Sequence, residues 1–290
     1  MIREIQTRTI INRVSAPDSW FGLHYNMNLY RGCSHRCIYC DSRSECYGID
    51  CFDRDVLVKT NAVDLLRDRL PRLRIKGTIG TGSMNDPYQP VEKKIELTRR
   101  ALEVIAENHF PVHVITKSDL VLRDADLLEK ISKVYSAVTF TVTTADETLA
   151  GKLEPFAPSV TARFKAMRQL SERGIHTGIT LMPVLPFITD NPANILAILD
   201  MAAESGAEYI IPFLGVTLRD GQREHFLREI EQVFPGMNRK YREHFGNMYH
   251  CTVSNAGLLE GILREACDKR SILLEMPFYD PFDNGQMDLF

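Results

Sequence analysis

An alternation of strand-like and helix-like segments constrains the fold of this chain more than any other feature of its sequence. From residue 61 onward, short β-rich runs alternate with longer runs of helical periodicity. This pattern is typical of repeated βα units around a parallel sheet. The expected strands are 26–30, 76–80, 111–115, 138–143, 176–182 and 208–213, and the expected helices are 61–72, 93–108, 123–134, 160–173 and 192–205.

Six strands joined by right-handed crossovers predict an α/β fold, a (β/α)6 partial TIM barrel, with an open doubly wound sheet as the less favoured alternative. Asn108 and Gly174 stand at the ends of two expected helices, where residues of these types stop a helix. A chain of 290 residues with 44% hydrophobic side chains is large enough to bury one such core. In either arrangement we expect the catalytic and ligand-binding residues at the carboxyl ends of the strands.

The chain divides into three expected parts. Residues 1–215 hold an N-terminal segment and the barrel. Residues 216–278 are more polar and predict a helical C-terminal extension that caps the barrel. Residues 279–290 combine Pro, Asp, Asn and Gly with a hydrophobic end, a composition that predicts a flexible tail.

The overall composition limits the class of protein. The chain has no run of about 18 uncharged apolar residues, and its first ten residues carry charges where a signal peptide is apolar, so we expect a cytoplasmic protein with no membrane partner. A net charge of −3 argues against binding duplex nucleic acid through charge alone. The basic residues of 219–242 are interleaved with acidic ones, which favours a solvated helical face over a nucleic-acid groove.

Four of the seven cysteines lie between residues 33 and 46. Cys33, Cys37 and Cys40 have the spacing C-x3-C-x2-C in RGCSHRCIYC, directly after the first expected strand. Three thiolates at this spacing can bind one [4Fe–4S] cluster and leave one iron open to a substrate or cofactor. Gly32 lets the backbone bend before the first ligand, and Tyr39 can cover the cluster with an aromatic face.

The alternative for this loop is a zinc site on Cys33, Cys37, Cys40 and Cys46. Structural zinc sites usually carry two paired halves, and here the second half is missing. His35, the other zinc candidate, is left unassigned. The spacing therefore favours an iron–sulfur cluster.

Through these cysteines and several further blocks, the sequence resembles the radical S-adenosylmethionine (SAM) superfamily, and within it the spore photoproduct lyase-like branch. The resemblance covers about residues 24–270 and rests on the blocks YRGCSHRCIYC, GTGSMNDPYQPVE, ITKSDLVLRDADLL, TFTVTTADETLAGKLEPFAPSVTARFKAM and GITLMPVLPFITDN. It implies an enzyme with a [4Fe–4S] cluster and SAM as cofactors. One electron from the cluster then cleaves SAM to a 5′-deoxyadenosyl radical. An electron donor such as flavodoxin or ferredoxin is implied as a partner.

The resemblance also implies SAM-binding residues at the ends of the second and third expected strands. Ser83, Met84, Asn85 and Asp86 follow the second strand, where related enzymes bind the amino group of SAM, and we expect Ser83 and Asn85 to do so. Lys117 ends the third strand, and the matching lysine of the lyase-like branch neutralises the SAM carboxylate. Taken alone, Lys117 would be read as a solvated loop lysine.

Further candidates for SAM binding come from the cysteine loop and the fourth strand. Thr141 and Thr143 share one face of that strand and are candidates for the ribose, although threonine is also an ordinary strand former. Arg163 is a candidate for the SAM carboxylate or for structural pairing with Glu154. Tyr39 completes the expected set.

One departure from the resemblance bears on the reaction. Spore photoproduct lyase donates hydrogen from a cysteine just after the second strand, where this chain has Ser83, and it has an aromatic residue where this chain has Asp41. A serine O–H is too strong to donate a hydrogen atom as a thiol does. Cys46, Cys51 and Cys251 are candidate replacements, but a buried inert thiol is the favoured role of each.

The last five residues resemble the sliding-clamp-binding motif of bacteria. In Gln286-Met287-Asp288-Leu289-Phe290, Leu289 and Phe290 would fill an apolar pocket on the clamp while Gln286 makes hydrogen bonds beside it. The alternative is a structural hook on the barrel. Binding to the β clamp would concentrate the protein at DNA without a basic surface.

Together these features predict a lyase-like radical SAM enzyme that acts on nucleic acid, with DNA favoured, in lesion repair or base modification. A second hypothesis is modification of RNA, protein or a small metabolite. A third, of another class, is a non-catalytic iron–sulfur or zinc module that binds DNA-processing partners.

Overall fold

The computed structural model describes residues 1–15, 19–49, 52 and 55–282. Cys51 and the segment from Gln286 to Phe290 lie outside the described residues, so their expected roles stay predictions. In the described ranges no helix is long and apolar enough to cross a membrane. The cytoplasmic location stays a prediction.

Seven strands form the central sheet, in the order β10-β9-β8-β7-β6-β3-β2. They are β2 (Ile11–Arg13), β3 (Tyr25–Met27), β6 (Ile79–Thr81), β7 (Val112–Thr116), β8 (Ser136–Thr141), β9 (His176–Leu181) and β10 (Tyr209–Pro212). The last six pair in parallel, and β2 pairs antiparallel with β3 at the edge. Each parallel strand overlaps one of the six expected strands, so the predicted α/β partial barrel is confirmed.

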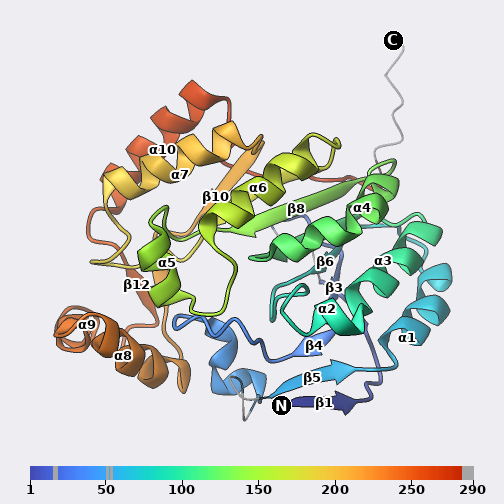
Figure 1. The fold of residues 1–290 in the computed structure, drawn as a ribbon, viewed down its shortest axis with the longest axis horizontal. Helices are drawn as coiled ribbons and strands as arrows, with labels where there is room; N and C mark the ends of the chain where they lie inside the picture. The colour runs from blue at the N-terminus through green and yellow to red at the C-terminus, as the bar shows by residue number, and fades with distance from the viewer. Residues whose placement is uncertain (16–18, 50–51, 53–54, 283–290) are drawn as a thin grey trace.

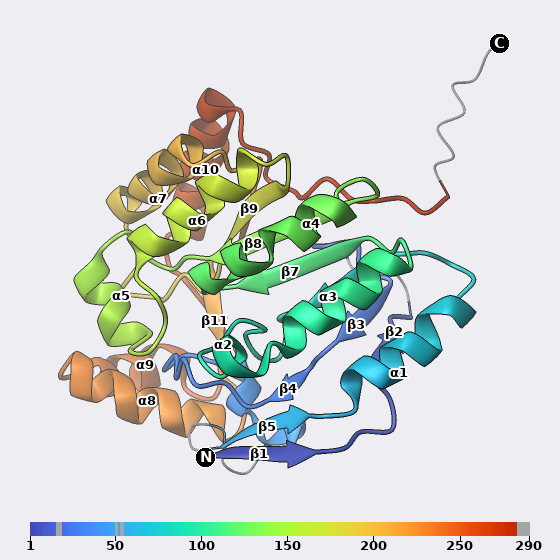
Figure 2. The same cartoon turned by 45° about the vertical axis from the view of Figure 1, so that its right-hand side comes forward.

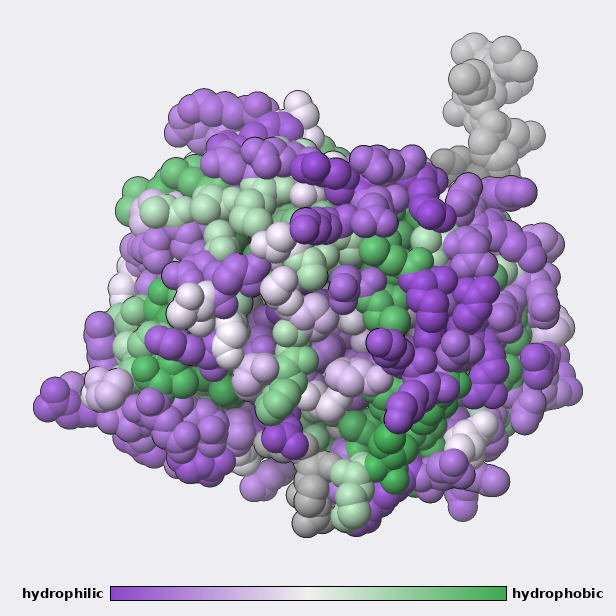
Figure 3. Space-filling view, in the orientation of Figure 1, coloured by the Kyte–Doolittle hydropathy of each residue, from purple (hydrophilic) through white to green (hydrophobic). Residues whose placement is uncertain are grey.

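Helices follow the strands and cover the outside of the sheet (Figure 1 and Figure 2). They are α1 (Ala62–Arg69), α2 (Glu92–Ile95), α3 (Leu97–Glu107), α4 (Ala125–Ile131), α5 (Glu147–Leu153), α6 (Val160–Ser171) and α7 (Pro192–Glu204). On α3, the buried residues Leu97, Ala101 and Ile105 recur at helical spacing and join the main core. Figure 3 shows hydrophilic residues over most of the outer helices in this view, with hydrophobic ones between them.

The structure corrects three of the expected elements. The strand expected at 26–30 ends at Met27, and β4 (Tyr30–Arg31) pairs instead with β5 (Val56–Lys59), which also pairs with β1 (Ile2–Ile5). The helix expected at 93–108 is broken at Glu96, whose φ is 52°. The helix expected at 123–134 begins earlier as a 3-10 turn, η4 (Asp119–Asp124), because Ser118 accepts a hydrogen bond from the backbone of Leu120.

The C-terminal extension contains three helices and two short strands among its described residues: β11 (Gly215–Thr217), α8 (Gln222–Val233), α9 (Met237–Phe245), β12 (His250–Thr252) and α10 (Ala256–Arg270). Strand β11 pairs antiparallel with β12. Phe226 and Tyr241 of the helical pair α8–α9 share a buried cluster with Ile38 and Tyr39 of the cysteine loop. The extension therefore supports this loop, while the boundaries of the three expected parts stay predictions.

Candidate active site

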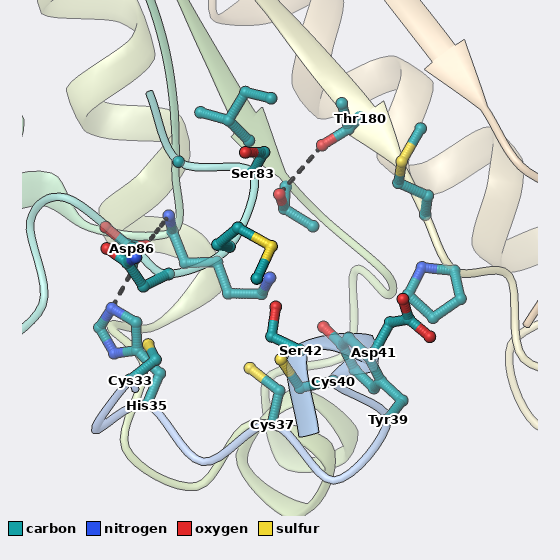
Figure 4. Close-up of a pocket in the computed structure, with 18 of the residues that line it drawn as sticks. Cys33, His35, Cys37, Tyr39, Cys40, Asp41, Ser42, Ser83, Asp86 and Thr180 are labelled. Atoms are coloured by element: carbon teal, nitrogen blue, oxygen red, sulfur yellow. Dashed lines mark hydrogen bonds and ion pairs between the residues drawn. The ribbon is translucent and has the colours of Figure 1, made fainter. Parts of the chain in front are cut away.

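A pocket of about 350 Å³ opens at the carboxyl ends of the barrel strands, a size typical of small-molecule sites. Its walls come from the cysteine loop, the segment after β6 and the ends of β7, β8 and β9 (Figure 4). Of the residues expected to bind the cluster or SAM, those that line this pocket are Cys33, Cys37, Tyr39, Cys40, Ser83, Asn85, Lys117 and Thr141. Parallel strands end at one edge of a barrel, which is why residues so distant in sequence meet here.

The three cysteines come from one bent loop and lie on the same side of the pocket, opposite Ser83 (Figure 4). Cys33 and Cys37 are buried, and Cys40 is half-buried. The loop turns at Gly32, whose φ is 79° and where a Cβ would lie 2.5 Å from a backbone oxygen. Only glycine fits this turn, as expected from the sequence.

The cysteine loop suits a cluster better than a single metal ion. Among the residues that the structure describes, no three His, Cys, Asp or Glu side chains lie close enough to hold one ion. Cluster ligands bind different irons, so they lie farther apart than the ligands of one zinc ion. Burial raises the pKa of Cys33 to about 12 and raises the pKa values of Cys37 and Cys40 as well. Positively charged iron would stabilise the thiolates against this cost.

Asp86 ties the ends of two strands to the cysteine loop. Its Oδ1 accepts a hydrogen bond from Thr116 Oγ1 (2.7 Å), and its Oδ2 accepts one from the backbone N–H of Lys117 (2.7 Å). His35 Nε2 lies 3.3 Å from Oδ2 (Figure 4). Burial alone would raise the pKa of Asp86, but His35 and these hydrogen bonds lower it to about 2. The sequence showed Asp86 in the right loop but gave it no role, because its partners come from other segments.

Lys117 points its charge toward the cysteine loop. Its Nζ lies 5.6 Å from the centre of the Tyr39 ring. Burial would lower the pKa of Lys117, but Cys37 and Glu154 more than offset this effect and raise it. Lys117 is therefore a cation inside the pocket, which is what an anionic group of a ligand would require.

Asn85 and Ser83 hold different positions after β6. The side-chain amide of Asn85 is buried and donates a hydrogen bond to the carbonyl of Tyr30 (2.8 Å), which fixes its orientation. Ser83 is exposed, and its hydroxyl lies 3.3 Å from the side-chain nitrogen of Asn26. Both line the pocket.

Arg163 supports the pocket from outside rather than lining it. Its guanidinium pairs with the buried carboxylate of Glu154 and donates to the carbonyls of Thr141 (3.0 Å) and Pro158 (2.9 Å). Glu154 in turn accepts a hydrogen bond from the hydroxyl of Tyr39. Of the two roles considered for Arg163, the geometry supports structural pairing with Glu154, which positions Tyr39 at the pocket wall.

Thr143 does not reach the pocket with Thr141. The hydroxyl of Thr141 accepts a hydrogen bond from Thr180 (3.0 Å), and both line the pocket, whereas Thr143 is buried beyond the end of β8. Among the candidate hydrogen donors, Cys251 is fully buried and Cys46 is exposed beside Arg219, so the expected burial of Cys46 is wrong.

Several pocket residues were not singled out in the sequence. They are Phe21, Ser42, Ile115, Thr180, Met182, Pro183, Phe213, Val216 and Thr217. Thr180, Met182 and Pro183 fall in the block GITLMPVLPFITDN, whose residues were not expected to bind a ligand. Phe21, Phe213 and Thr217 come from segments with no such signal.

Comparisons with known proteins found a matching family and several relatives. The radical SAM superfamily matches residues 27–199. An uncharacterized protein of Methanocaldococcus jannaschii is 36% identical over 191 residues, covering 65% of this chain and 70% of that protein. An uncharacterized protein of Mycobacterium tuberculosis is 30% identical over 247 residues, covering 83% of this chain and 72% of that protein.

The fold also resembles solved structures. Spore photoproduct lyase with bound AdoMet and dinucleoside spore photoproduct matches with a TM-score of 0.69 and 14% identity, covering 92% of this chain and 79% of that one. At this identity the match shows a shared fold.

Proposed function

Because the chain belongs to the radical SAM superfamily, whose members use a [4Fe–4S] cluster and SAM, we propose that Cys33, Cys37 and Cys40 hold the cluster and that SAM binds in the pocket beside them. One observation carries this proposal: three buried or half-buried cysteines from one loop line the same pocket as Lys117, a half-buried cation. When bound, the cluster supplies one electron that cleaves SAM to methionine and a 5′-deoxyadenosyl radical.

The residues of this chain bind and orient SAM in this proposal. Lys117 neutralises the carboxylate of SAM, because its raised pKa keeps it charged in the pocket. The fixed amide of Asn85, with Ser83 beside it, meets the amino group, and the hydroxyl of Thr141 meets the ribose. Tyr39 covers the cluster side of the pocket and is positioned through Glu154 by Arg163.

The test uses protein reconstituted anaerobically with iron and sulfide. We expect one [4Fe–4S] cluster per chain and release of 5′-deoxyadenosine on addition of dithionite and SAM. Replacing Cys33, Cys37 or Cys40 by Ala should abolish both, whereas Cys251→Ala, a buried cysteine outside the pocket, should retain both. Full activity in any of the first three variants would refute the ligand assignment.

We further propose that the substrate is DNA carrying a damaged or modifiable base. Support comes from the shared fold with spore photoproduct lyase, one structure of which holds a dinucleoside spore photoproduct. Ser83 stands where that enzyme has its cysteine hydrogen donor, so base modification or repair by another hydrogen source is favoured over the lyase's own route. Oligonucleotides with and without ultraviolet damage, incubated with SAM and reductant, should give a DNA product together with 5′-deoxyadenosine.

The same preparation separates the competing hypotheses. A product from RNA, peptide or a metabolite, with none from DNA, would favour the second hypothesis. Zinc in place of iron, with no 5′-deoxyadenosine, would favour a non-catalytic module. Radical SAM enzymes need a reductant, and flavodoxin or ferredoxin should replace dithionite in the assay.

A further inference from the structure

We propose that a row of exposed and half-exposed side chains beside the pocket binds single-stranded DNA by stacking against its bases. The row, here called the aromatic rim, consists of Trp20, Phe213, His250, Tyr249, Arg219 and Tyr47. Four separate segments of the chain contribute to it. The inference rests on the proposed function and specifies the form of its substrate.

Four of the six members of the rim form a continuous series of rings. The ring centres of Trp20 and Phe213 are 6.4 Å apart, and those of Phe213 and His250 are 6.3 Å apart. The rings of His250 and Tyr249 follow at 4.3 Å. These spacings are those of interacting aromatic pairs, so the rings form one connected surface.

Arg219 extends the series toward the cysteine loop. Its guanidinium carbon lies 5.0 Å from the ring centre of Tyr249 and 5.8 Å from that of Tyr47. Its Nε lies 3.4 Å from Asp41, the residue directly after Cys40. Its Nε and Nη2 donate hydrogen bonds to the hydroxyl of Tyr249 (3.1 Å and 2.6 Å), which hold the guanidinium at this end of the series. A guanidinium can stack on a base as a ring does.

The rim is joined to the pocket at two places, and three of its six members are exposed to solvent. Phe213 lines the pocket itself, and Asp41, which lies beside Arg219, lines it as well. Trp20 is 45% exposed and Tyr249 is 38% exposed. Large aromatic side chains at a pocket mouth indicate a binding surface, because their exposure otherwise carries a cost in water.

Single-stranded DNA is the ligand that this surface fits. Every base has a flat face, so a row of rings binds consecutive bases without regard to sequence. The hollow beside Arg219 holds Arg223 together with the acidic residues Glu45, Asp220 and Glu224, and the whole chain has a net charge of −3. Attraction to the phosphates of either a duplex or a single strand is therefore weak, and the binding energy must come from stacking on bases, which a single strand leaves open. Chemistry on a base also requires that the base leave the stack, which a single strand allows at low cost.

The occupancy of the rim can be measured directly, because Trp20 is the only tryptophan in the sequence. Cluster-loaded protein is titrated anaerobically with a fluorescently labelled thymine oligonucleotide of twelve bases, about one single-strand site. Label anisotropy reports binding, and tryptophan emission from an unlabelled titration reports stacking on Trp20. We expect saturable quenching at the same concentrations as binding, and weaker binding of a duplex of the same length.

Matched variants separate stacking from other effects. Trp20→Ala should weaken binding, measured by label anisotropy, roughly ten-fold, the effect of losing one stacked base, whereas Trp20→Phe should bind within about two-fold of the unchanged protein because it keeps a ring. Phe282→Ala removes an aromatic residue that is 68% exposed but lies outside the rim, so this variant should bind the oligonucleotide with unchanged affinity. Iron content and circular dichroism of each variant check that it has folded.

Three results would overturn the inference. They are binding of the oligonucleotide without a change in Trp20 emission, equal affinity for the duplex, and a preference for RNA or a peptide over DNA. Release of 5′-deoxyadenosine by the same preparation, measured without DNA, is independent of the rim. If 5′-deoxyadenosine is released although the oligonucleotide does not bind at the rim, the proposed radical SAM chemistry stands and only the DNA-binding inference is refuted. If no 5′-deoxyadenosine is released, the proposed radical SAM chemistry is refuted independently of the rim.

Discussion

Replacing Arg163 by methionine tests the buried ion pair behind the pocket wall. Arg163 is 1% exposed, and its guanidinium pairs with Glu154 and donates to the carbonyls of Thr141 and Pro158. Methionine fills much of the space but donates no hydrogen bond. Loss of one partner of a buried pair costs about 3–5 kcal/mol, and each buried carbonyl left without a donor adds about 1 kcal/mol. We expect the free energy of unfolding to fall by about 5 kcal/mol.

Urea unfolding of the cluster-loaded protein, followed by far-ultraviolet circular dichroism, measures this loss. Arg168→Met is the matched control, because Arg168 is exposed on the same helix and donates to the carbonyl of Glu204 (2.8 Å); it should change stability by less than about 0.5 kcal/mol. Adding Glu154→Gln to the Arg163 variant removes the stranded charge and should recover part of the loss. A loss below about 1 kcal/mol in the single variant would refute the reasoning.

The pH dependence gives a second, independent check on Glu154. Burial would raise the pKa of Glu154, but Arg163 and Lys117 lower it below its ordinary value. The carboxylate therefore contributes stability above the unfolded pKa of about 4.3, and this contribution is lost as the pH falls through the folded value. Without Arg163 the pKa of Glu154 should rise, so that protonation at lower pH removes the unpaired buried charge of the variant. The loss in free energy of unfolding of the Arg163 variant, relative to the unchanged protein, should therefore be smaller at pH 5 than at pH 7.

Three further predictions concern SAM binding, backbone geometry and the tail. Lys117→Ala should weaken SAM binding by about 1.5–3 kcal/mol in titrations of cluster-loaded protein, with iron content unchanged, and equal affinity would return Lys117 to a structural role. Gly82→Ala should lower the free energy of unfolding in urea by more than about 2 kcal/mol, because φ at Gly82 is 106° and a Cβ would lie 2.1 Å from a backbone oxygen of β7. The control is Gly151→Ala, whose added Cβ meets no atom within 4 Å and should not destabilise the protein. Equal stability of the two variants would contradict this prediction. Changing Leu289 and Phe290 to Ala should abolish β-clamp binding in surface plasmon resonance without lowering the melting temperature, and a lowered melting temperature with no clamp binding in the unchanged protein would identify a structural hook.

The sequence by itself determined the features whose signals are local. Cys33, Cys37 and Cys40, the proposed cluster ligands, lie within one loop, so their spacing could be read directly. The six barrel strands could be read because buried strands and amphipathic helices have different periods. Lys117 and Asn85 could be placed at the pocket because they follow strands whose carboxyl ends meet.

Only the tertiary structure decided the features that depend on pairing between distant segments. Strands β1, β4 and β5 lie before residue 61, outside the alternation of strands and helices, and they form a separate sheet by pairing with one another. The sequence offered Arg163 two roles, pairing with Glu154 or binding SAM, and could not decide between them. It assigned no hydrogen-bond partners to Asp86. Both answers depend on which side chains meet in the packed chain. The aromatic rim joins four segments whose residues share no spacing, so its continuity arises from the fold alone.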